Sequence, residues 1–215
     1  MTETSLMDEG LIPGQFGNMW RKNTIILSSP GGQRSAGMPL MMGGRGGGGI
    51  TPIRISATFV DSALINTGVS VFSLYSRMTG DEAARFRTNF DEKHKPEKYY
   101  YVWMEMETFY TPEILNTSRW NIFWEDEKGN QYEPYLITEF PQDKNLTPGT
   151  SPYAGQSGRH TVWKMSKKIY QLYFPKKRVD GNPVLASDAR QMKLTVLNWR
   201  NPEERYEGTW AFPLK

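Results

Sequence analysis

The sequence predicts an all-β protein, an antiparallel β-sandwich with one short helix and an extended N-terminal arm. Three observations lead to this fold class. Short apolar segments alternate with polar residues in the two-residue period of strands, turn residues separate them, and no strand–helix–strand repetition appears. About eight or nine strands with short turns favour two stacked antiparallel sheets, and both an immunoglobulin-like and a jelly-roll strand order fit this pattern.

The 215 residues suit one domain with a tail, which we divide into a Gly-rich arm over residues 1–52 and a sandwich domain over residues 53–215. The glycine tract 43–49 would lose too much entropy on ordering to fold through its own contacts. The arm also contains large apolar side chains that a plain linker does not need. We expect these to contact a partner in extended form: Phe16, Met19, Trp20, Met38, Leu40, Met41 and Met42.

Alternation of apolar and polar residues predicts the strands. The predicted strands span residues 53–59, 69–75, 99–110, 119–124, 131–140, 161–165, 168–174, 192–199 and 208–212. In the longest of them, Val102 and Met106 should face one side, and Trp103 and Glu107 the other. Pro134 lacks a backbone N–H, so its strand should lie at a sheet edge or contain a bulge.

Turn and cap residues connect these strands. Turns are expected at 66–68, at 128–130 and at 180–182, where Gly or Asn tolerates a positive φ. The single predicted helix begins after Thr79 or Asp81, has Glu82 in its first turn and continues to Arg87. A polar loop over 91–96 should follow it.

One segment resembles a known family. From Trp120 to Ile137 a strand ends in the acidic turn Glu125-Asp-Glu-Lys-Gly-Asn130, and Tyr132-Glu-Pro134 then begins the return. This segment resembles the middle hairpin of bacterial immunoglobulin-like accessory domains. The resemblance implies a fold class and no function.

Composition excludes several kinds of chemistry. The chain has no cysteine, so disulfides, thiolate nucleophiles and Cys-ligated metal sites are absent. The net charge is only +3 and the basic runs are short, so nucleic-acid binding is not expected. The glycine tract does not match a phosphate-binding loop. No apolar run is long enough for a membrane helix, and the first residues do not form a signal peptide. We therefore expect a soluble protein without a cofactor, cytoplasmic unless its start is a processed N-terminus.

Few side chains suggest a reactive centre. His94 and His160 each lie in a polar stretch, far apart in sequence, and we expect both at the surface. Glu105 and Glu107 share a strand face and have the side-chain types of a glycosidase pair, but a solvated strand shows the same pattern.

Two further groups of residues suggest ligand binding. Asp126, Glu127 and Asn130 could hold calcium, although their loop lacks the usual alternation of acidic ligands. Aromatic residues make up 13% of the chain, and Tyr99, Tyr101 and Trp103 on one strand face could stack on a sugar.

These observations predict a non-catalytic interaction or structural protein, a peripheral subunit that joins a larger assembly through its arm and aromatic surface. Its partners would be other proteins or copies of itself. A carbohydrate-binding module or lectin is the first alternative, and a self-assembling coat protein with an ordered arm is the second.

Overall fold

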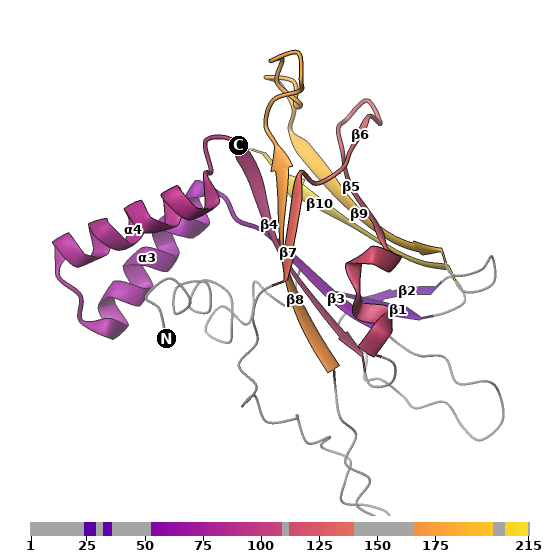
Figure 1. The fold of residues 1–215 in the computed structure, drawn as a ribbon, viewed down its shortest axis with the longest axis horizontal. Helices are drawn as coiled ribbons and strands as arrows, with labels where there is room; N and C mark the ends of the chain where they lie inside the picture. Colours follow the sequence, from indigo (N-terminus) through magenta and orange to yellow (C-terminus); the bar gives the residue numbers. More distant parts are fainter. Residues whose placement is uncertain are drawn as a thin grey trace, which may run out of the picture.

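The computed structural model describes residues 24–28, 32–35, 53–108, 112–139, 166–199 and 205–214. Within these ranges two antiparallel sheets face each other, and a helical hairpin stands out to one side of them (Figure 1). The predicted two-sheet architecture is therefore confirmed. The described part also contains a helical element larger than the sequence pattern indicated.

Sheet A has six strands in the order β2-β1-β3-β4-β8-β7. Their bounds are β1 Thr24–Ser28, β2 Gly32–Ser35, β3 Ile53–Phe59, β4 Tyr99–Thr108, β7 Leu136–Glu139 and β8 Ser166–Pro175. Sheet B has four strands in the order β10-β9-β5-β6. Their bounds are β5 Asn121–Glu125, β6 Gln131–Tyr132, β9 Gln191–Trp199 and β10 Arg205–Pro213. Two short 3₁₀ helices, η1 Pro112–Leu115 and η2 Thr117–Arg119, precede β5.

The main core lies between the two sheets. Alternate residues of β4 point into it, so that Met104 lies opposite Tyr170 of β8 in the strand register. From sheet B, Trp124 is completely buried, and its ring lies 4.9 Å from that of Phe174 and 5.8 Å from that of Phe59. Large rings from both sheets therefore fill the space between them, as the aromatic content of the chain indicated.

Part of the predicted arm belongs to sheet A. β1 pairs with β3, with Ile25 opposite Ile55, and β2 pairs with the other side of β1. The boundary at residue 52 stays a prediction, but residues 24–28 and 32–35 extend the sheet rather than leave it.

Pro134 marks the point where the chain leaves sheet B and enters sheet A. β6 is the outermost strand of sheet B, β7 is the outermost strand of sheet A, and Pro134 lies between them. Tyr135 donates its backbone N–H to the Tyr173 carbonyl, although the register places the next residue, Leu136, opposite Tyr173. Two residues thus oppose one, which is a bulge, and the expectation of an edge or a bulge is confirmed.

Two turns follow their sequence signals. Gly129 has a φ of 80° in the hairpin between β5 and β6, and Gly181 has a φ of 83° in the turn after β8. In the second turn the Asp180 side chain accepts the Asn182 backbone N–H. Residues with side-chain carbonyls or no Cβ favour these conformations.

The strand predicted over 69–75 is wrong, because these residues lie in helix α3, Ser62–Ser76. The Asp61 side chain caps this helix by accepting the Leu64 backbone N–H. The hydroxyls of Thr67, Ser70 and Ser73 each donate to the carbonyl four residues earlier, so polar side chains that favour other structures are satisfied inside the helix. The turn predicted at 66–68 is likewise part of α3.

The single predicted helix is longer than expected. α4 spans Gly80–His94 and begins with a capping box, in which Thr79 and Glu82 each accept the other's backbone N–H. It continues through the predicted polar loop and ends at Lys95, whose φ is 46°. The protein thus has two long helices in its described part, and they form the hairpin of Figure 1.

The base of the hairpin packs on the outer face of sheet A, away from sheet B. Ile65 of α3 and Phe86 and Phe90 of α4 join Tyr101 and Trp103 of β4 in a second apolar cluster. The far end of the hairpin extends away from the strands (Figure 1).

Candidate functional site

The outer face of sheet A combines aromatic and charged side chains. Odd-numbered residues of β4 point to this face, in the order Tyr101, Trp103, Glu105 and Glu107. The face therefore has an aromatic half at the helical hairpin and a charged half further along the strands. Each half contains residues that the sequence singled out.

The aromatic half is covered. Tyr101 and Trp103 are 2% and 1% exposed, because the base of the hairpin packs over them. Tyr99, the third member of the predicted stacking platform, is half-buried. The structure thus brings the three residues onto one face but leaves no open surface of three rings on which a sugar could stack.

His94 contradicts the expectation of a surface histidine. It is 1% exposed, its Nδ1 lies 2.8 Å from the Tyr173 hydroxyl, and its ring stacks on Tyr101 at 4.4 Å. Residues Phe86, Phe90 and His94 are spaced four apart, so they share the helix face that meets the sheet. The polar neighbours of His94 in sequence concealed this position, whereas the spacing could have indicated it. His160 lies outside the described residues.

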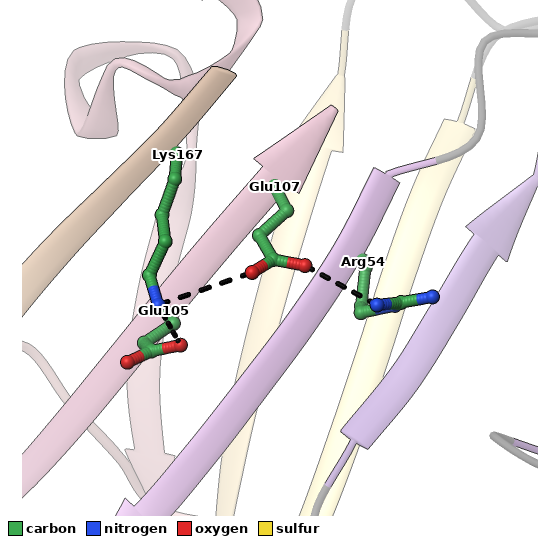
Figure 2. Close-up of polar contacts among 4 residues, drawn as sticks. All are labelled: Arg54, Glu105, Glu107 and Lys167. Carbon is green, nitrogen blue, oxygen red and sulfur yellow. Dashed lines mark hydrogen bonds and ion pairs between the residues drawn. The ribbon is translucent and has the colours of Figure 1, made fainter. Parts of the chain in front are cut away.

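The charged half is a row of alternating charges across three strands (Figure 2). The Lys167 ammonium of β8 lies 2.7 Å from Glu105 and 3.9 Å from Glu107, both on β4. Arg54 of β3 lies 3.4 Å from the other oxygen of Glu107. Each carboxylate therefore has a cation beside it, and the row joins three neighbouring strands of sheet A.

Glu105 is the buried member of this row. Only 5% of the residue is exposed, and this burial raises the pKa of its carboxyl group, while the Lys167 ammonium and the Trp103 indole act in the opposite direction. A carboxyl group whose pKa is raised can hold a proton at higher pH than usual. The residue types are those of a general acid and its partner, but both carboxylates are already paired with the Lys167 ammonium.

In the turn that could hold calcium, hydrogen-bond donors of the protein itself occupy the oxygens of the Asp126 carboxylate. The Asp126 side chain accepts the backbone N–H groups of Lys128 and Asn130, the Asn130 amide and the Tyr132 hydroxyl. Burial favours a higher pKa for Asp126, but these hydrogen bonds outweigh it, and the pKa is lowered. Glu127 accepts the backbone N–H of Arg190 instead of pointing to the same centre. The arrangement stabilises a hairpin turn.

A group of apolar side chains at the edge of sheet A is open to solvent. Tyr135 is 70% exposed and stacks on Tyr99, with ring centroids 5.3 Å apart and planes 18° apart. Leu136, the first residue of β7, is 48% exposed. We call Tyr99, Tyr135 and Leu136 the aromatic edge. Neither Tyr135 nor Leu136 was among the predicted contact residues, although the expectation of an edge or a bulge at Pro134 applied to their strand.

The remaining predicted contacts lie outside the described residues. These are Phe16, Met19, Trp20, Met38, Leu40, Met41 and Met42. Among the residues that the structure does describe, no group of three or more acidic or histidine side chains could hold a metal ion. No helix in the same ranges has the length and apolarity needed to cross a membrane.

No protein-family model, curated protein or solved structure matches this chain.

Proposed function

We propose that the chain is a non-catalytic subunit of a larger protein assembly, which it joins through the N-terminal arm and the aromatic edge. The observation that supports this proposal most directly is the exposure of Tyr135 and Leu136 at the edge of a sheet. The immunoglobulin-like or jelly-roll description of the sandwich remains an architectural hypothesis within the same proposal.

The aromatic edge has the properties of a protein contact. Tyrosine loses little side-chain entropy on binding and combines a large apolar ring with a polar tip, so it is enriched at interfaces. Tyr99 holds the Tyr135 ring in a stacked position before any partner arrives. A ring that is already oriented reduces the entropy lost on binding.

The charged row supports a structural role rather than catalysis. Glycoside hydrolysis needs two carboxyl groups that reach a substrate between them. Here Lys167 lies close to both Glu105 and Glu107, and Glu105 is buried. Ion pairs between neighbouring strands fix the strands relative to one another and require no ligand.

The proposal is tested in the native source, with the tagged chain expressed at its natural level. After size exclusion and light scattering, we expect a particle heavier than one or two copies of the chain, with a defined partner by mass spectrometry. Tyr135→Ser and removal of residues 1–23, which end before β1, should each release the chain from this particle.

Val179→Ser is the matched control, because Val179 is a fully exposed apolar residue that is not part of the aromatic edge. It should leave the particle intact. If the unaltered chain elutes from its native source without any other protein, the proposal is wrong.

A further inference from the structure

The outermost strands of the two sheets differ in what they expose. β2 has the sequence Gly-Gln-Arg-Ser, and β6 has only two residues. The exposed residues of β10 are small: Thr209, Ala211 and Pro213. Among the outermost strands described, only β7 combines an exposed large apolar side chain, Leu136, with an exposed ring beside it, Tyr135. An apolar edge strand is a template for pairing with another strand.

The register shows which backbone groups of β7 point outward. The Tyr173 carbonyl accepts from Tyr135, so Tyr173 directs its backbone groups toward β7. In an antiparallel pair such residues alternate, so Leu136 and Thr138 of β7 point toward β8. The N–H and C=O groups of Ile137 and Glu139 therefore point away from sheet A.

The charge of β7 is already neutralised within its own subunit. Glu139 is the only charged residue of the strand, and the Lys168 ammonium lies 2.9 Å from its carboxylate. Two copies of this edge can therefore approach each other without an uncompensated like charge. A strongly charged edge would resist such pairing.

We propose that β7 pairs with β7 of a second copy of this chain, antiparallel about a two-fold axis. The register that uses both outward-pointing residues places Ile137 of one copy opposite Glu139 of the other, with the two Thr138 residues opposite each other. Sheet A then continues from one copy into the next. This inference goes beyond the proposed function, because a second copy is a partner that the larger assembly need not contain.

The proposed pairing between the two β7 strands is short, so the association should be weak. Pro134 and the bulge at Tyr135 limit the pairing strand to the four residues Leu136–Glu139. Such a contact is smaller than the roughly 1,200 Å² of a stable interface, so we expect a dissociation constant between about 10 μM and 1 mM. Association should therefore be visible only at high protein concentration.

Sedimentation velocity of the full chain over this concentration range tests the proposal. Thr138 is exposed, so Thr138→Lys leaves the fold intact but places two ammonium groups opposite each other across the axis. We expect this variant to associate at least about tenfold more weakly. The matched control is Thr209→Lys on β10, also an exposed threonine of an outermost strand, which should behave as the unaltered chain.

A second comparison uses two variants with opposite charges at position 138. Thr138→Glu alone should likewise associate at least about tenfold more weakly, whereas an equimolar mixture of Thr138→Lys and Thr138→Glu chains should associate at least as tightly as the unaltered chain. The mixture excludes misfolding as the cause of the loss. The proposal is overturned if the unaltered chain stays monomeric throughout, if Thr138→Lys associates normally, if Thr209→Lys shares its defect, or if mixing restores nothing.

Discussion

A lysine–glutamate pair joins neighbouring strands on the outer face of each sheet. In sheet A, Lys167 lies 2.7 Å from Glu105, whose side chain is only 6% exposed. In sheet B, Lys193 lies 3.7 Å from Glu125, whose side chain is 25% exposed. The residue types are alike, but Lys193 lies directly opposite Glu125 in the strand register, whereas Lys167 lies opposite Glu107. The two carboxylates also differ in their exposure to water.

This difference shows that the outer faces of the two sheets are unlike environments. Burial weakens the hydration of a carboxylate, and a neighbouring cation must then replace that hydration. Glu105 has lost most of its water, and burial raises its pKa in spite of Lys167. Glu125 retains contact with solvent, where a charge pair contributes little to stability. The outer face of sheet A is therefore buried around Glu105.

The largest effect is expected when the buried pair loses its cation. Lys167→Met removes the ammonium beside Glu105 and leaves a buried carboxylate without it. We expect a loss of about 3 kcal/mol in the free energy of unfolding at neutral pH. The loss should shrink at mildly acidic pH, where Glu105 takes up a proton. Urea denaturation at both pH values measures it, and an equal loss at both would contradict this account.

A smaller effect is expected when the buried pair loses its carboxylate. In Glu105→Gln, Lys167 is partly exposed and still has Glu107 at 3.9 Å. We expect a change of less than about 1 kcal/mol at neutral pH, and the double variant Glu105→Gln/Lys167→Met should recover most of the loss caused by Lys167→Met. A Glu105→Gln loss as large as that of Lys167→Met would show that the burial of Glu105 is not the controlling factor.

The direction of the pH dependence follows from the raised pKa of Glu105. The folded chain binds this proton more readily than the unfolded chain does. The stability that results is complete below the ordinary pKa of glutamate and is lost as the pH rises through the raised value in the folded chain. Glu105→Gln lacks this loss, so its stability relative to the unaltered chain should increase as the pH rises.

The smallest effect is expected at the exposed pair. Lys193→Met leaves Glu125 in contact with water, so we expect a change of less than about 0.5 kcal/mol, which added salt should reduce further. Thermal unfolding at low and high salt checks this value. A cost close to that of Lys167→Met would mean that strand pairing, rather than burial, determines the strength of both pairs.

The sequence predicted strand positions and side-chain faces correctly where one face of a strand packs against a hydrophobic core. Alternation in 53–59 and 99–108 correctly placed β3 and β4, and the faces of Val102 and Trp103 were assigned correctly. Alternation failed at 69–75, because a short apolar run such as Val69-Ser-Val-Phe72 does not by itself distinguish a strand from a helix. The cap at Asp61 begins the helix, and the hydroxyl–carbonyl bonds of α3 satisfy its Ser and Thr side chains; neither appears in a two-residue period.

The candidate site was only partly accessible from the sequence. Glu105 and Glu107 were assigned to one face, but the cation between them comes from a strand some sixty residues later, and only the register of β4 against β8 brings Lys167 there. The cover over Tyr101 and Trp103 could not be predicted either, because α3 was taken for a strand. Long-range pairing and tertiary packing determine both features.

The central claim is that the outer face of sheet A is buried around Glu105, which leaves the edge of this sheet as the proposed place of partner contact. Carbon-13 NMR of the glutamate carboxyl groups tests it most directly, with the Glu105 signal assigned by its absence from Glu105→Gln. We expect the Glu105 signal to titrate above the ordinary range of a glutamate. If it titrates at or below that range in the folded chain, this face is open to water, and the account is contradicted.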